Sequence, residues 1–91
     1  MTAADVKIDF DATASLKKWP SIRGERRTDA PFPYLVQEGT LLECIEALLS
    51  KAAASHHLYE VHTDAQEPWV KAVLSAPHVY ELVRLRKVLT F

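Results

Sequence analysis

The chain of 91 residues has a single cysteine and only two glycines, and its formal net charge is −1. One cysteine cannot form an internal disulfide, which is typical of a protein from a reducing compartment. Two isolated glycines cannot build a glycine-rich loop that cradles phosphate groups. A net charge close to zero provides no strong field over the whole molecule to attract nucleic acid or a membrane surface.

Long apolar runs are also missing from the sequence. No stretch of about 18 apolar residues occurs, so we expect no membrane-spanning helix. The N-terminal residues lack the basic and apolar regions of a secretory signal. These absences together predict a soluble cytoplasmic protein. The length and the ordinary hydrophobic content of 48% predict one globular domain.

The clearest positive signal is an amphipathic helix expected near 41–54. Thr40 and Glu43 have the spacing of a capping box at its start. Apolar side chains then recur at helical spacing and share one stripe, which is formed by Leu41, Ile45, Leu48, Leu49 and Ala52. Burial of four large aliphatic side chains, at roughly 2 kcal/mol each, gives a gross gain of about 8 kcal/mol before entropy is subtracted. The helix therefore needs an apolar surface beneath it.

The chain around this helix predicts a small sheet and a second helix. Residues 69–74 could also begin a helix, but their valine and tryptophan content and the nearby Pro77 favour a strand. Sequential strands usually pair, so we predict an α+β fold, a two-layer sandwich with both helices on one face of the sheet. The expected elements are strands near 34–37, 57–63 and 69–75 and a helix near 76–90.

Residues 1–33 are predicted to form an N-terminal arm and loop attached to a compact core of residues 34–91. Apolar and polar residues alternate over 5–10, and this pattern allows a short strand there. The sequence predicts a short helix over 12–19, with Asp11 as its cap and Leu16 and Trp19 as its large apolar side chains. Residues 20–33 contain three prolines and a glycine and are predicted to be a loop.

The leading functional prediction is a non-enzymatic domain that self-associates as a twofold dimer or binds another protein, without a cofactor. Charge blocks of opposite sign favour it, because residues 16–28 sum to +4 and residues 29–68 to −6. A two-layer fold leaves one face of the sheet uncovered, and an apolar patch there would mark a contact site. The candidate residues of this interaction surface are Trp19, Tyr34, Tyr59, Trp69 and Val73.

Weak nucleic-acid binding through the basic segment 17–27 is an alternative. This segment combines positive charge with an aromatic ring, as phosphate contacts and base stacking require. No nucleic-acid-binding motif accompanies it, and pairing of these charges with the acidic middle block is the competing interpretation. The basic residues concerned are Lys17, Lys18, Arg23, Arg26 and Arg27.

A small enzyme or metal-binding domain is the third class of function considered. His57 and His62 are an odd number of positions apart, so they would face opposite sides of a regular strand and could not bind one ion together. Cys44 lies at the edge of the apolar stripe, which favours a buried, inert thiol over a nucleophile. We therefore assign no catalytic or metal-ligating residue. The candidates considered for this class are Cys44, His56, His57, His62 and His78.

Overall fold

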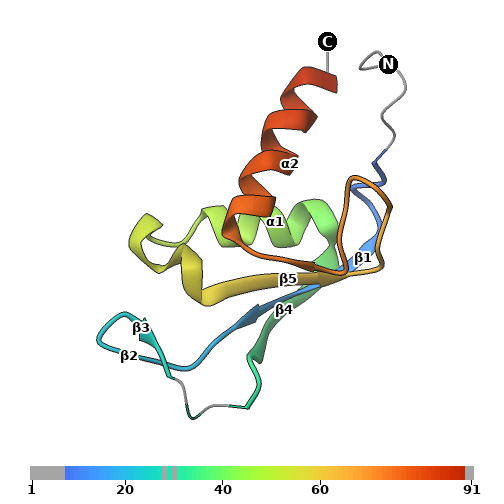
Figure 1. The fold of residues 1–91 in the computed structure, drawn as a ribbon. Coiled ribbons are helices and arrows are strands. Elements are labelled where there is room, and N and C mark those ends of the chain that lie inside the picture. Colours follow the sequence, from blue (N-terminus) through green and yellow to red (C-terminus); the bar gives the residue numbers. More distant parts are fainter. Residues whose placement is uncertain (1–7, 28, 30, 90–91) are drawn as a thin grey trace.

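The computed structural model describes residues 8–27, 29 and 31–89 of the chain. The strands are β1 (Thr13–Lys18), β2 (Ser21–Ile22), β3 (Glu25–Arg26), β4 (Tyr34–Thr40), β5 (Tyr59–Thr63) and β6 (Val73–Leu74). The helices are α1 (Leu41–Leu49), the 3₁₀ helix η2 (Ala53–Leu58) and α2 (Ala76–Leu89). The main sheet is antiparallel in the order β4-β1-β5-β6, and the helices lie on one of its faces (Figure 1). The α+β class and the two-layer arrangement are therefore confirmed.

The central strand of the sheet is β1, and the prediction of a short helix over 12–19 is wrong. β1 pairs with β4 on one side and with β5 on the other. Ala14 and Leu16 are buried beneath the helices, whereas Ser15 and Lys17 lie on the opposite face. Pairing with two strands at once outweighs the local helical signals. The sheet therefore draws on residues from both sides of residue 33.

The predicted loop over 20–33 contains a second correction, because β2 and β3 form a hairpin. Arg23 and Gly24 make its turn, with φ angles of 54° and 79°. Two consecutive left-handed residues are typical of a type I′ turn, whose twist matches that of the flanking strands. The sequence has a glycine at the second of these positions, where it adopts this conformation without a steric penalty.

The capping box at the start of α1 is confirmed. The backbone N–H of Glu43 donates to Thr40 Oγ1 over 3.1 Å, and the backbone N–H of Thr40 donates to Glu43 Oε1 over 2.9 Å. The helix ends at Leu49, five residues before the expected end at 54, because the chain then enters η2. Leu49 itself is 37% exposed although it belongs to the predicted apolar stripe.

The hairpin expected from residues 57–63 and 69–75 is present as the pair β5 and β6, but it is shorter. The backbone N–H groups of Trp69 and Val70 both donate to the Gln66 carbonyl, so these residues form a turn instead of a ladder. The possible strand over 5–10 is not formed at residues 8–10, and its other residues lie outside the described part of the chain.

One hydrophobic core fills the space between the sheet and the two helices. α2 has nearly the expected bounds, and its C-terminal half extends beyond α1 (Figure 1). The molecule measures 43 × 23 × 20 Å, with the β2–β3 hairpin near one end and the end of α2 near the other. Among the described helices none is long and apolar enough to cross a bilayer. The fully buried large side chains include Leu16, Leu41, Ile45, Leu48, Val61, Leu74, Val79 and Leu82.

Candidate functional site

The most exposed apolar strand of the protein is β4. Residues 34–38 are all exposed, although they belong to the main sheet. β4 pairs only with β1, and no other described strand occupies its outer edge. Unpaired backbone groups along an edge, combined with exposed apolar side chains, are the arrangement that proteins use for strand-to-strand association.

Exposed large hydrophobic side chains gather at this strand. Tyr34, Leu35 and Val36 are 49%, 52% and 39% exposed, and Phe32 just before them is 74% exposed. These four account for nearly half of the nine large hydrophobic side chains that are exposed in the described residues. We call Phe32, Tyr34, Leu35 and Val36 the β4 surface. Exposed apolar side chains at the edge of a sheet mark a candidate contact site.

A bulge shapes the same strand. Leu16 in β1 is opposite Gln37, whereas Lys17 is opposite Leu35, so Val36 has no opposite residue in β1. A bulge increases the local twist of the strand. A partner strand at the outer edge must follow this twist, and a second copy of β4 carries the same twist at the same position.

Trp19, the first candidate of the predicted interaction surface, is engaged within the molecule. Its indole N–H donates to the carboxylate of Glu60 in β5. The guanidinium carbon of Arg26 lies 3.3 Å from the centroid of the Trp19 ring, a cation–π contact. Trp19 therefore has one ring face covered and its hydrogen-bond donor satisfied.

The structure does not bring the other four candidates of that surface together. Tyr59 is 8% exposed and lies on the helix side of the sheet, so it cannot contribute to an exposed surface. Trp69 is half-buried and packs against the core. Tyr34 and Val73 are exposed, but they lie in β4 and β6 at opposite edges of the sheet. Only Tyr34 belongs to the β4 surface.

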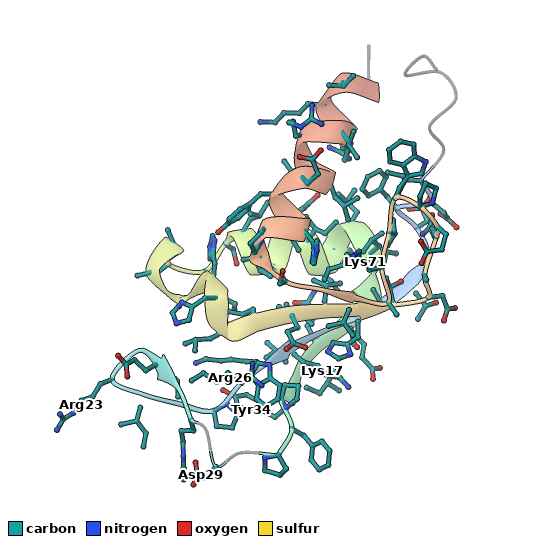
Figure 2. All side chains as sticks on the ribbon, viewed as in Figure 1. Lys17, Arg23, Arg26, Asp29, Tyr34 and Lys71 are labelled. Carbon is teal, nitrogen blue, oxygen red and sulfur yellow. The ribbon has the colours of Figure 1, made fainter. Side chains whose placement is uncertain are left out.

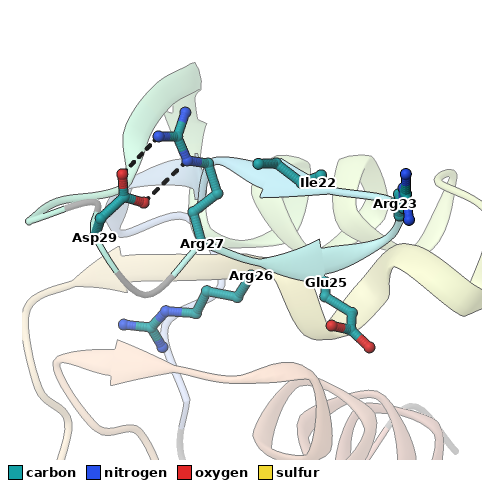
Figure 3. A pocket seen from close by; sticks show the side chains of 6 residues that line it. All are labelled: Ile22, Arg23, Glu25, Arg26, Arg27 and Asp29. Carbon is teal, nitrogen blue, oxygen red and sulfur yellow. Dashed lines mark hydrogen bonds and ion pairs between the residues drawn. The ribbon is translucent and has the colours of Figure 1, made fainter.

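The basic residues of the hairpin do not converge on one point (Figure 3). Arg23 lies at the turn, Arg26 covers Trp19, and Arg27 forms an ion pair with Asp29 at 2.6 Å. This hydrogen-bonded pair lowers the pKa of the Asp29 carboxyl and raises the pKa of the Arg27 guanidinium. An open hollow of about 680 Å³ lies beside them. Since the three guanidinium groups point in different directions, they do not form a phosphate-binding cluster.

The two lysines of the basic segment lie on β1 (Figure 2 labels Lys17). Lys17 is on the uncovered face of the sheet, opposite Leu35 in β4 and Glu60 in β5. Lys18 Nζ is 5.7 Å from the centroid of the buried Tyr59 ring.

A polar row on the uncovered face was not found from the sequence. His62 Nε2 donates to Glu60 Oε2 over 2.9 Å, and Ser15 lies opposite His62 in the register of β1 and β5. Ser15 and His62 border a hollow of about 430 Å³ that Glu38 also lines. The alternation of buried and less buried residues along β1 indicates this row, but residues 12–19 were predicted to be a helix.

The other histidine candidates form hydrogen bonds within the molecule. His56 is buried, and its Nε2 donates to the Lys51 carbonyl over 2.8 Å while Nδ1 accepts from the Tyr80 hydroxyl over 2.6 Å. His57 Nε2 donates to the Gly24 carbonyl at the hairpin turn. His78 Nδ1 lies 3.0 Å from the hydroxyl of Ser75, the residue before α2.

Cys44 is fully buried on α1. Burial, with a smaller contribution from the charge of Glu43, raises the pKa of its thiol. A thiol that stays protonated is a poor nucleophile. Within the described residues, no three histidine, cysteine, aspartate or glutamate side chains are placed to hold a metal ion.

No protein-family model, curated protein or solved structure matches this chain. The functional argument therefore depends on the surfaces described above. Of these, the β4 surface combines the largest apolar exposure with a free strand edge.

Proposed function

We propose that this protein is a non-enzymatic, cytoplasmic interaction domain that self-associates as a twofold dimer through β4. The observation that carries this proposal is the seven-residue strand whose outer edge no described strand occupies and whose residues Tyr34, Leu35 and Val36 are exposed and hydrophobic. The net charge of −1 supports it, because two copies repel one another little. The single buried Cys44 fits a reducing compartment.

The geometry of the dimer follows from the geometry of antiparallel pairing. A twofold axis perpendicular to the sheet places two β4 strands side by side and joins the two four-stranded sheets into one of eight strands. The free backbone groups on each outer edge then find partners in the other copy. Strand addition of this kind gains affinity from main-chain hydrogen bonds and specificity from the side chains beside them.

Sedimentation velocity over protein concentrations from micromolar to about 1 mM tests the proposal. We expect the wild type to form a dimer and Leu35→Lys, which places a charge in the β4 surface, to weaken dimerisation at least tenfold. Val73→Lys is the matched control, because Val73 is 46% exposed but lies on β6 at the other edge. A wild type that stays monomeric throughout, or equal effects of the two variants, would refute dimerisation through β4.

Cysteine cross-linking tests the predicted symmetry. Gln37 is the middle residue of β4, so a twofold axis near it brings the two copies of this position to adjacent strands. Cα atoms on adjacent antiparallel strands are roughly 4.5–5.5 Å apart, a separation that a disulfide can span. We expect Gln37→Cys to form a cross-linked dimer under mild oxidation, and the control Lys71→Cys to form none. The buried Cys44 leaves the wild type uncross-linked.

Weak nucleic-acid binding through residues 17–27 stays a prediction with less support. Base stacking needs an accessible ring, and Arg26 covers one face of Trp19. Titration with single-stranded and double-stranded oligonucleotides at low and high salt measures this activity. Binding that weakens steeply with salt would favour it over a purely protein-binding role.

A further inference from the structure

An apolar groove lies between α1 and α2. It encloses about 150 Å³. Leu42, Ile45 and Val83 contribute to its apolar lining, and Leu49 at its border is 37% exposed. Two charged residues also line it, Glu46 from α1 and Arg86 from α2. The groove therefore offers an apolar floor between one negative and one positive side chain.

The tip of the β2–β3 hairpin carries side chains of complementary type, one apolar and two of opposite charge. Ile22 is 59% exposed and is followed by Arg23 at the turn, while Glu25 lies opposite Ile22 in the register of the hairpin. The tip therefore offers an apolar side chain between one positive and one negative residue. Neither these two charged residues nor the two of the groove form an ion pair with another described residue.

The hairpin is held in a fixed position. His57 Nε2 donates to the Gly24 carbonyl at the turn over 2.9 Å. The backbone N–H of Arg27 donates to the Pro20 carbonyl over 2.8 Å, and Arg26 stacks on Trp19. A segment that is ordered before it binds loses little conformational entropy on docking.

We propose that the hairpin tip of one molecule docks into the α1–α2 groove of a second copy of this chain. Ile22 occupies the apolar hollow, which Phe10 also lines, because a hollow of about 150 Å³ lined by apolar side chains holds a group of about the size of benzene. Arg23 then faces Glu46, and Glu25 faces Arg86. Charge complementarity on both sides of the apolar anchor selects the hairpin as the occupant.

The main sheet lies between the β2–β3 hairpin and the helices α1 and α2 (Figure 1), so the hairpin tip does not reach the groove of its own molecule. The contact is therefore head-to-tail and leaves one free hairpin and one free groove at the ends of each assembly. A single side chain in a small hollow buries much less than a standard interface, so the association is weak. It uses none of the four residues of the β4 surface and is independent of dimerisation through β4.

Complementation between two defective variants tests the proposal, with Leu35→Lys as the parent chain so that dimerisation through β4 is weakened at least tenfold. Ile22→Asp removes the anchor and leaves the groove, whereas Leu49→Asp disrupts the groove and leaves the hairpin. We expect each variant alone to associate at least tenfold more weakly than the parent, and an equimolar mixture to form a one-to-one dimer. Val88→Asp is the control, because Val88 is an exposed residue of α2 outside the groove lining.

A charge exchange provides a second measurement that does not alter the apolar anchor. Arg23→Glu and Glu46→Arg should each weaken association of the parent chain, and the double variant should recover it. Circular dichroism and thermal melting of each variant establish that it is folded. Should Leu49→Asp prevent folding, the charge exchange alone decides the question.

Three results would overturn the proposal. The parent chain could stay monomeric at 1 mM, the mixture of the two defective variants could fail to associate, or Ile22→Asp could associate as strongly as its parent. The last result would show that the groove accepts another part of the second copy or that a different surface is used. Since dimerisation through β4 is judged by comparing the wild type with Leu35→Lys, the two proposals succeed or fail separately.

Discussion

Replacement of Leu16 by alanine tests whether β1 is the centre of the fold. Leu16 is fully buried in the middle of β1, where it lies opposite Gln37 on one side and Val61 on the other. Truncation of such a leucine removes apolar contacts and leaves a cavity that the two neighbouring strands prevent from collapsing. Measured costs for this substitution are about 2–5 kcal/mol, and we expect a value near 3 kcal/mol.

A loss of this size is large for a domain of 91 residues, whose total stability is about 5–15 kcal/mol. At about 4–8 °C per kcal/mol, the midpoint of thermal unfolding should fall by about 12–24 °C. Chemical denaturation followed by circular dichroism measures the free energy of unfolding directly. The matched control is Leu35→Ala, the same chemical change at a leucine that is 52% exposed, with an expected cost below about 0.5 kcal/mol.

Equal destabilisation by Leu16→Ala and Leu35→Ala would refute the reasoning. A short surface helix over 12–19, as the local sequence pattern predicts, would leave Leu16 only partly buried. Its truncation would then lower the free energy of unfolding only slightly. The experiment therefore distinguishes the central strand from the helix. It is performed at low micromolar concentration, so that changes in self-association do not contribute.

Further outcomes are expected from three individual side chains. Thr40→Ala removes the side-chain half of the capping box and should cost about 1 kcal/mol in denaturant unfolding, with Glu46→Gln as the unaffected control. Tyr80→Phe leaves Nδ1 of buried His56 without its donor and should cost about 1–3 kcal/mol, whereas the exposed Tyr34→Phe should cost almost nothing. Cys44 should react with alkylating reagents at pH 8 far more slowly in the folded than in the unfolded chain. Folding raises the pKa of this thiol above its ordinary value of 9.0. The contribution of the protonated thiol to stability is therefore complete below pH 9 and is lost as the pH rises through the higher folded pKa. Melting curves recorded between pH 7 and 11 measure this loss.

The candidate site was only partly predictable from the sequence. Tyr34 was correctly expected to be exposed, but Leu35 and Val36 were expected only as parts of a strand. Whether a strand lies at an edge depends on which segments pair with it. β4 lies at the edge because β1, which precedes it by more than a dozen residues, takes the position between β4 and β5.

The basic segment shows the same limit. The sequence places five cations around Trp19, but it does not say which of them face one another. A turn at Arg23 and Gly24 folds the segment back, so that Arg26 covers the ring and Arg27 turns to Asp29. Side chains that are close in sequence therefore point in different directions, and their charges do not combine at one site.

The sequence by itself determined α1 and its cap, the hairpin of β5 and β6, the start of α2 and the α+β class. These features arise from interactions between residues close in the chain, whose spacing is visible in the sequence. Only the tertiary structure decided that residues 13–18 form the central strand and that β4 lies at the edge. Pairing between distant strands supplies hydrogen bonds and burial on a scale that exceeds local helix propensity, and no short window of sequence contains that information.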